Sequence, residues 1–463
     1  MSPTVMKFGG TSVGDVAAFE RVFQVVSTQI EKRPVVVVSA MTKVTDALLG
    51  AFETAKKGEP AEAFASLQPY FERHDQVSKH FILEGSSNGF SGELKFARGE
   101  LSDLLIRVSR RSLPLSMLKD AIVSYGEQLS SRLLAEVLKS KGVNARQMDS
   151  RRLIVTDDEY GAAQPIWEET EKLVQLELEP LIAAGEIPVM GGFIAASRAG
   201  ETTTLGRGGS DYSAALVAAA LRAGELQIWT DVTGVMTCDP RICVEATTIP
   251  VLSYEEAAEL AYFGAKVLHP KTIKPAVDHN IPVRVCNTFE PDKIGTMVLV
   301  ESGETRNKIK SIAHKKDITI LRITSARMLG SYGFMSALFQ IFDRYRTVID
   351  VISTSEVSVA LTLDNTDSLE QIVKELERLG DVEVEKGYAV ICVVGEGLRA
   401  STGLASKIFS TIDDTNIALV SHGASSVNLT FVVKENVAAC VIRKLHLKFF
   451  KTIHKVSLEG VLS

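Results

Sequence analysis

Hydrophobic positions in the first two thirds of the chain form short continuous runs that alternate with amphipathic stretches. The runs at 34–39, 187–190 and 227–230 are typical of strands buried on both faces of a parallel sheet. The stretches between them carry apolar residues at helical spacing. We expect further strands at 143–148 and 282–286, and helices at 16–30, 115–139, 165–184, 213–221 and 254–263. The alternation predicts an α/β fold in which helices sandwich a mainly parallel sheet.

The pattern changes after residue 287, where one unit of sequence is repeated. Residues 347–363 and 415–431 match at a fixed offset of 68 positions, so that Ser353 corresponds to Ser421. Each copy has two alternating strands, with a further strand ahead of it at 319–323 or 388–394. Helices are expected on either side of the copies, at 333–346, 366–379, 403–413 and 436–449. This order predicts two ferredoxin-like βαββαβ modules with a ligand site at their seam.

The composition is that of a globular protein of several domains and argues against two classes of partner. Hydrophobic residues make up 45% of the 463 positions and the net charge is -6, so neither nucleic acid nor an anionic membrane is an expected partner. No apolar run approaches the length of a membrane span, and the first residues lead into a strand without a signal-peptide pattern. We therefore expect a cytoplasmic protein.

The five cysteines are scattered along the chain, without a Cys-x-x-Cys pair and without clustered histidines. Reduced, structural thiols are the expectation for such a pattern, and a protein metal site is not.

The first candidate for chemistry is the stretch KFGGTS at 7–12, which the pattern places between a strand and a helix. The amides of a Gly-Gly turn can approach an anion closely, and the positive end of the following helix points the same way. The lysine precedes the glycines, unlike the lysine of a Walker A loop. The stretch is a candidate phosphate site, although a glycine turn with an incidental lysine explains it equally well.

A second candidate is GRGGSDY at 206–212, just before an alanine-rich helix. Three glycines around Arg207 build a flexible loop that faces an anion at a helix N-terminus, and an arginine can hold a carboxylate with two hydrogen bonds. Ser210 or Asp211 could instead simply cap the helix.

Polar residues elsewhere in the first half are weaker candidates. Ser39 and Thr45 follow the strand at 34–39, where open parallel sheets bind ligands, but Thr45 could equally cap a helix. Gly126 lies inside the helix at 115–139, where glycine costs about 1 kcal/mol relative to alanine, so it indicates close approach by another group. Glu127 beside it could face an ammonium group, although a solvated glutamate is the simpler interpretation.

Four motifs occur in the order and spacing of one enzyme family. They are KFGGTS at 7–12, GRGGSDY at 206–212, TDVTG at 230–234 with DPR at 239–241, and FGAKVLHP at 263–270. With its two repeats, the chain resembles aspartate kinase (aspartokinase) over nearly its whole length, and the repeats resemble paired ACT domains. The resemblance implies an amino-acid kinase domain over 1–293 and ACT domains over 315–386 and 387–463, with a strand from 306–314 as a candidate to complete the second.

The resemblance implies that ATP, with Mg²⁺ bridging its oxygens, phosphorylates the β-carboxylate of L-aspartate to give 4-phospho-L-aspartate and ADP, the first step towards lysine, threonine and methionine. Lys7 and Asp211 would be catalytic, with Asp211 orienting Lys7. The residues implied for aspartate are Ser39, Thr45, Glu127, Arg207, Gly208, Gly209 and Ser210. Those implied for ATP are Lys7, Phe8, Gly9, Gly10, Thr230, Asp231, Met236, Arg241, Lys266 and Val267. Met236 stands where many relatives have tyrosine, so an aromatic contact to the adenosine would be missing or replaced by a thioether.

The first repeat is similar to that of single-function aspartokinases inhibited by lysine. L-Lysine is therefore the implied effector, at the start of the helix after Gly333, where free N–H groups would meet its carboxylate. The residues implied for it are Met328, Ser331, Gly333, Phe334, Met335, Ile349, Asp350, Ser355 and Glu356, with Asp350 or Glu356 available to the amine. A homodimer through the ACT domains is also implied. The alternatives are a non-catalytic amino-acid sensor and a kinase of the same fold acting on another carboxylate.

Overall fold

The computed structural model describes residues 2–82, 89–264, 268–301, 309–330 and 332–450, which pack as two compact units. The N-terminal unit comprises Met1–Val235, Pro250–Tyr254 and Val267–Glu301, and the C-terminal unit comprises Met236–Ile249, Glu255–Lys266 and Ser302–Ser463. Two short segments within the range 1–293 therefore pack with the C-terminal unit. The domain boundaries stay a prediction.

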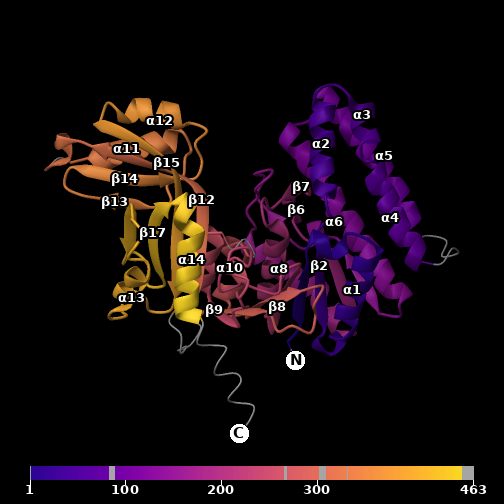
Figure 1. Ribbon diagram of the computed structural model, residues 1–463. Coiled ribbons are helices and arrows are strands. Elements are labelled where there is room, and N and C mark those ends of the chain that lie inside the picture. Colours follow the sequence, from indigo (N-terminus) through magenta and orange to yellow (C-terminus); the bar gives the residue numbers. More distant parts are fainter. Residues whose placement is uncertain (1, 83–88, 265–267, 302–308, 331, 451–463) are drawn as a thin grey trace, which may run out of the picture. The chain divides into compact units, whose positions relative to one another are not determined.

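An eight-stranded sheet forms the centre of the N-terminal unit (Figure 1). Its strands are β1 (Thr4–Phe8), β2 (Pro34–Val38), β3 (Ala145–Met148), β5 (Ile187–Gly191), β8 (Glu225–Thr230), β9 (Val251–Ser253), β10 (Val283–Asn287) and β11 (Thr296–Leu299). Their order is β3-β5-β2-β1-β8-β10-β11-β9, and all neighbours are parallel except β10 and β11. The predicted, mainly parallel sheet is confirmed. The strand predicted at 282–286 is not the last one, however, because β11 turns back antiparallel to β10.

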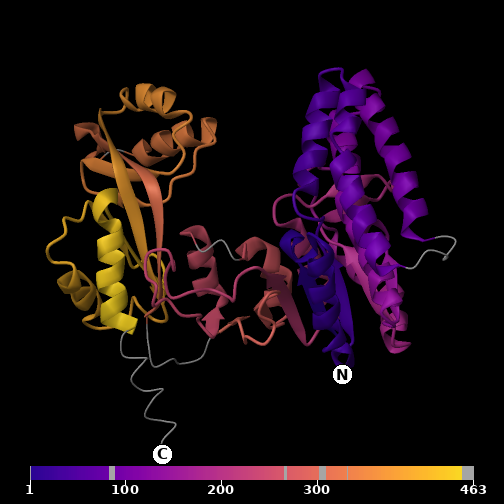
Figure 2. The same ribbon diagram turned by 45° about the vertical axis from the view of Figure 1, so that its right-hand side comes forward.

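The helices of the N-terminal unit cover this sheet and form a bundle beside it. They are α1 (Val16–Ser27), α2 (Val44–Lys56), α3 (Pro60–Ala65), α4 (Gln68–Phe81), α5 (Phe90–Arg110), α6 (Leu115–Ser140), α7 (Trp167–Ala183), α8 (Gly209–Ala220) and α10 (Pro270–Asp278). Helices α2 to α6 gather in one bundle, coloured indigo to magenta in Figures 1 and 2. Helix α6 packs on β2 and β5, and α8 packs on β1, β2 and β8. The four valines of β2 are consequently fully covered, as their continuous apolar run predicts.

A second, three-stranded sheet was not predicted. It consists of β4 (Val155–Thr156), β6 (Ile194–Ser197) and β7 (Thr202–Thr204), in the order β4-β6-β7. These strands are two to four residues long, too short to show a period of their own.

The C-terminal unit contains one six-stranded antiparallel sheet, with strand order β13-β14-β12-β15-β17-β16. Its strands are β12 (Ile309–Thr324), β13 (Ile352–Thr354), β14 (Ser358–Leu363), β15 (Asp381–Gly395), β16 (Leu419–His422) and β17 (Asn428–Lys434). Its helices are α9 (Tyr254–Tyr262), α11 (Phe334–Arg344), α12 (Leu369–Leu376), α13 (Leu404–Thr411) and α14 (Glu435–Phe450). Every helix and strand predicted for the two repeats is present.

Strands β12 and β15 are long, and each serves both repeats (Figure 2). The second half of β12 pairs with β14 of the first repeat and with residues 381–385 of β15. The first half of β12, from residue 309 to 315, pairs with residues 390–395, which in turn pair with β17 of the second repeat. The segment suggested for this role was 306–314, of which 306–308 lie outside the described residues. The two modules are thus built from exchanged strands.

A buried ion pair joins α9 to β12 within the C-terminal unit. Lys310 Nζ lies 2.8 Å from Glu256 Oε2, and the exposed fractions of the two side chains are only 5% and 0%. Breaking a buried ion pair costs far more than breaking an exposed one, because the remaining charge stays uncompensated in a medium of low dielectric constant.

Candidate active site

A cavity of about 400 Å³ opens at the C-terminal ends of β1 and β2 in the N-terminal unit. This is the edge at which open parallel sheets bind ligands. It brings together nine of the predicted site residues, namely Lys7, Gly10, Ser39, Thr45, Glu127, Gly208, Gly209, Ser210 and Asp211.

Lys7 forms an ion pair in this cavity. It is near the end of β1, and its Nζ lies 2.7 Å from Asp211 Oδ1 on α8. The two side chains are 11% and 16% exposed, so the pair is shielded from water on most sides but reaches the cavity. A partly desolvated ammonium group of this kind attracts an anion more strongly than a surface lysine does.

The glycines after Lys7 allow a close approach of two loops. A Cβ on Gly10 would lie 2.9 Å from the carbonyl oxygen of Ala40, so a side chain is excluded there. Gly9 N donates to Trp229 O of the neighbouring strand β8, and Phe8 is buried and stacks on the Trp229 ring. Phe8 therefore holds the turn from inside the core and does not line the cavity.

The helix expected directly after the glycines begins later. Gly10–Val13 is a 3-10 turn, and α1 starts at Val16 with the Asp15 side chain accepting from Ala18 N. Within this stretch Gly10 lines the cavity, and α1 does not.

Glu127 is buried, which corrects the interpretation as a solvated glutamate. Glu127 is 3% exposed and lines the cavity. Its Oε2 atom has no hydrogen-bond partner among the described residues. Burial raises the pKa of Glu127 to about 8, although backbone amides and the charge of Lys7 act in the opposite direction. A cationic ligand group would relieve the cost of ionising this carboxyl.

Gly126 is explained by the same packing. A Cβ there would lie 2.7 Å from the Cβ of Ala40, so the close approach that the helical glycine indicated is confirmed. It seats α6 against the loop after β2 and sets the position of Glu127.

The loop before α8 has positive φ angles of 74° at both Gly206 and Gly208. Helix α8 starts at Gly209 with Gly208 as its N-cap, and no side chain caps it, so neither Ser210 nor Asp211 is the cap. Arg207 lies between the two glycines and is exposed, and its side chain does not line the cavity.

Thr45 is in the first turn of α2 and is not the N-cap, which is Lys43. Ser39 and Thr45 both line the cavity. Lys43 was missed by the sequence analysis although it lies in the same loop. It lines the cavity with a left-handed backbone, at φ 66°, which is uncommon for a residue other than glycine. Other lining residues that were missed are Ala40, Met41, Thr42, Asp46 and Phe193, and Gly206 of the predicted glycine loop also lines the cavity.

The residues predicted for the nucleotide are divided between the units. Thr230 ends β8 beside β1, and its hydroxyl hydrogen bonds the adjacent Asp231. Met236 and Arg241 belong to the C-terminal unit, where Arg241 pairs with Asp239 at 2.8 Å and stays exposed. Lys266 and Val267 lie outside the described residues.

Three of the residues predicted for the effector form the start of α11. Gly333 is its N-cap with φ 84°, followed by the buried Phe334 and the half-buried Met335. Met328 and Ile349 pack on the apolar cluster under this helix, whereas Ser331 lies outside the described residues.

The two acidic candidates differ in their surroundings. Asp350 is held by Lys315, whose Nζ is 3.1 Å away, and by the hydroxyl of Tyr262. Glu356 is exposed, next to Ser355, whose hydroxyl hydrogen bonds that of Ser358 at 2.7 Å.

Comparison with known proteins gives matches over both units. Residues 2–287 match the amino acid kinase family, and residues 391–449 match an ACT domain. Lysine-sensitive aspartokinase 3 of Escherichia coli is 38% identical over 457 residues, which cover 96% of this chain and 99% of the relative.

Two crystal structures of E. coli aspartokinase III are similar to this structure. The complex with lysine and aspartate (T-state) gives a TM-score of 0.84 at 37% identity, over 97% of this chain and 99% of the other. The complex with aspartate and ADP (R-state) gives 0.79 at 36% identity, over 97% and 100%. Among the described residues, no helix is long and apolar enough to span a membrane.

Proposed function

Because the chain belongs to the aspartokinase family, we propose that it transfers the γ-phosphoryl group of ATP to the β-carboxylate of L-aspartate, giving 4-phospho-L-aspartate and ADP, the first step towards lysine, threonine and methionine. The observation that carries the proposal is the cavity in which the Lys7–Asp211 pair and the buried Glu127 meet between two glycine loops. One cavity thus contains an ammonium group that can bind phosphate and a carboxylate that can bind an ammonium group. Five free cysteines fit a reducing compartment such as the cytoplasm.

Lys7 neutralises charge on the transferring phosphoryl group. A carboxylate nucleophile needs no strong base, so catalysis depends on positioning and on electrostatic stabilisation. Asp211, 2.7 Å from Nζ, keeps the ammonium group aimed into the cavity. The amide of Gly10 adds a donor to the phosphate oxygens, whereas that of Gly9 is already donated to Trp229 O. Lys43, which lines the same cavity, supplies a second positive charge.

The protein binds aspartate mainly through the charged groups of the substrate. Glu127 takes its ammonium, Ser39, Thr45 and Ser210 take remaining polar atoms, and Gly208 and Gly209 let the substrate approach the backbone. Arg207 takes its α-carboxylate after the loop rotates at the two glycines that flank it. A glycine backbone can adopt both positive and negative φ angles, so this rotation costs little.

ATP is the donor, and Thr230, Asp231, Met236, Arg241, Lys266 and Val267 are proposed to hold its nucleoside and phosphates. Mg²⁺ prefers oxygen ligands, and in the described part of the chain no group of three carboxylates is close enough to form a protein site for it. We therefore propose that Mg²⁺ binds together with ATP, where it would neutralise charge on the phosphate oxygens.

The test is ADP release by the purified protein with Mg-ATP, with L-aspartate or L-glutamate added, and with or without millimolar L-lysine. Release that depends on aspartate supports the proposal. Release with glutamate alone would indicate a kinase for another carboxylate, and no release with either would indicate a non-catalytic sensor.

The raised pKa of Glu127 predicts that the KM for aspartate falls as the pH rises from 6 to 8. Below pH 8 the free carboxyl is protonated and must lose its proton to bind an ammonium group, so affinity gains up to about tenfold per pH unit. Above pH 8 the KM levels off. Steady-state kinetics at saturating ATP, recorded across this pH range, measures the slope.

Replacing Glu127 with glutamine should raise the KM about tenfold or more and remove the pH slope, since the charge-assisted hydrogen bond is lost. Glu136→Gln is the matched control, on the same helix but paired with surface cations, and it should keep the slope. A slope that persists in Glu127→Gln would contradict the assignment.

L-Lysine is proposed as the feedback inhibitor, bound at the start of α11. The N–H groups of Phe334 and Met335 would meet its carboxylate, and Glu356 would take an ammonium group because Asp350 is already held by Lys315. Glu356→Gln should then raise the lysine concentration for half inhibition about tenfold, with the uninhibited rate unchanged. If Asp350→Asn abolishes inhibition while Glu356→Gln does not, the carboxylates have been assigned the wrong way round.

A homodimer through the ACT domains is part of the proposal. The six-stranded sheet ends in two short strands, β13 and β16, which approach each other in this chain, so both would border the same contact with a second chain. Light scattering on the eluting protein measures the mass.

A further inference from the structure

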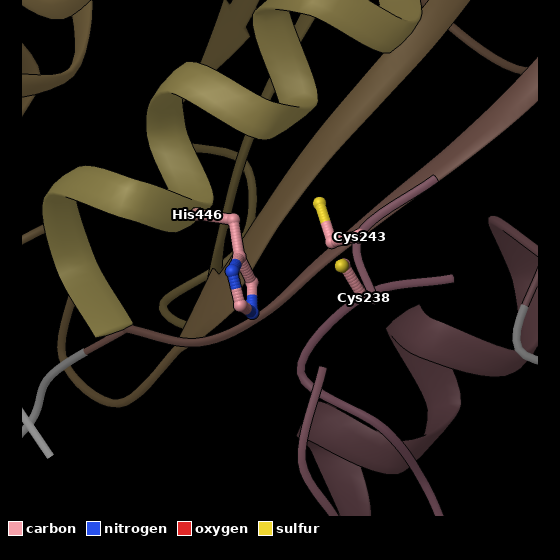
Figure 3. A group of neighbouring side chains, drawn as sticks. All are labelled: Cys238, Cys243 and His446. Carbon is pink, nitrogen blue, oxygen red and sulfur yellow. The ribbon is translucent and has the colours of Figure 1, made fainter. Parts of the chain in front are cut away.

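Two cysteines and a histidine from distant parts of the chain meet inside the C-terminal unit. Cys238 and Cys243 lie in the segment 236–249 and His446 lies on α14, and Figure 3 shows their side chains converging. The metal-ligating atoms lie within 4.8 Å of one another, and in the described ranges this is the one group of three or more such side chains that could hold a metal ion. Cys238 and Cys243 are free, buried thiols, as expected, but the fold brings them next to a histidine that the sequence places far away.

The surrounding backbone holds these side chains in place. The N–H groups of Ile242 and Cys243 both donate to Asp239 O, at 2.9 and 3.0 Å, so one tight turn presents both thiols. Cys238 forms a parallel bridge with Ile312 of β12. The His446 ring is oriented by a 2.9 Å hydrogen bond between its Nε2 and Thr237 Oγ1, and it stacks on Phe450.

The three residues are also shielded from solvent. Cys238, Cys243 and His446 are 3%, 2% and 4% exposed, and both cysteines belong to an apolar cluster with Ile309, Ile312 and Leu445. An imidazole in an apolar core carries a desolvation cost that an aliphatic side chain would avoid. Metal binding would offset this cost, whereas packing alone would not.

We infer that Cys238, Cys243 and His446 bind one borderline-soft divalent cation, Zn²⁺ in the first instance. Thiolate sulfur and imidazole nitrogen are its preferred ligands. In a tetrahedral zinc site, ligand atoms are separated by about 3.5 Å, so small side-chain rotations from the observed positions close the site.

The charges balance at this site. Binding breaks two S–H bonds and forms two S–Zn bonds, and both protons leave to solvent. One divalent cation with two thiolates and a neutral imidazole carries no net charge, as a site inside an apolar cluster requires. Among the described residues, no fourth histidine, cysteine or carboxylate joins this group, so the protein supplies three ligands. The bound ion joins the segment that carries Asp239 and Arg241 to α14, so it fixes a loop that otherwise depends on a few hydrogen bonds.

The experiment uses the full chain, freed of metal by a chelator and kept reduced with a phosphine so that no disulfide forms. Titration with Co²⁺ should produce sulfur-to-metal charge-transfer bands and the d–d bands of tetrahedral cobalt, saturating near one ion per chain. Zn²⁺ should then displace the cobalt, and Zn²⁺ alone should raise the melting temperature of the metal-free protein.

Cys243→Ala and His446→Gln should each abolish the charge-transfer bands or weaken binding at least tenfold, and should remove the zinc-induced rise in melting temperature. Cys440→Ser is the matched control, because it removes an exposed thiol from the same helix α14 and should change neither readout. Absence of the bands in the unaltered protein, or bands of equal strength in both variants, would overturn the inference. The unaltered protein decides the matter even if a variant fails to fold.

Discussion

Lys7→Met is expected to lower kcat for aspartate phosphorylation by about 10²–10³-fold, the usual effect of removing one preorganised group that stabilises charge in the transition state. The lysine is partly desolvated and is held by Asp211 at 2.7 Å, so no surface cation can replace it. The loss should fall on kcat more than on the KM for aspartate, because charge is redistributed over the phosphate oxygens only during transfer. Steady-state kinetics with both substrates separates the two.

Two variants make this result specific. Asp211→Asn should lower kcat less than Lys7→Met does, because the ammonium group remains but is less firmly aimed. Lys32→Met removes an exposed lysine of the same unit and should leave kcat unchanged. If Lys7→Met keeps the melting temperature of the unaltered protein and also most of its kcat, Lys7 has no part in the transfer.

Lys310→Met should destabilise the C-terminal unit by about 3–5 kcal/mol, because it removes the ammonium group that lies 2.8 Å from the buried Glu256 carboxylate. Replacing both partners, as in Lys310→Met with Glu256→Leu, should recover most of this loss, since the pair is then exchanged for apolar contacts. Urea unfolding followed by circular dichroism measures the midpoint of each variant.

The exposed pair of Lys444 and Asp414 provides the control. It lies in the same unit, and Lys444→Met should change the midpoint little because water screens its charges. A small effect of Lys310→Met, similar to that of Lys444→Met, would mean that the buried pair contributes nothing beyond packing. If the double variant is no more stable than Lys310→Met, the loss of stability comes from altered packing at this position and not from an uncompensated charge.

The parts of the fold that local patterns determine were predictable. The valine run of β2 can only be a strand covered on both faces, and the repeat at an offset of 68 residues determined the elements of both modules. The reversal at β11 and the pairing of β12 were not, because a strand's partner is chosen by contacts distant in sequence. Residues 309–324 form one continuous strand, and nothing in its sequence shows that its two halves serve different modules.

The site was predictable where glycine and charge occur together, and less so elsewhere. Gly10 and Gly126 are required by contacts with the same residue, Ala40, which explains why glycine was an informative signal. The burial of Glu127 could not be predicted, because a single sequence does not show which face of a helix packs against the rest of the protein. Lys43 is recognisable only by its backbone angle, and the meeting of Cys238 with His446 only by tertiary packing.

The exchange of strands between the two repeats has a consequence for biosynthesis. Residues 309–315 leave the ribosome first, but their partner at 390–395 follows only after about 70 more residues, which takes roughly 4–15 s at ordinary rates of elongation. During this interval the backbone groups of the strand have no partner, and unpaired strand edges of this kind promote aggregation. A fragment that begins at residue 316 would never receive this strand, so the second module should be insoluble when it is expressed without the start of β12.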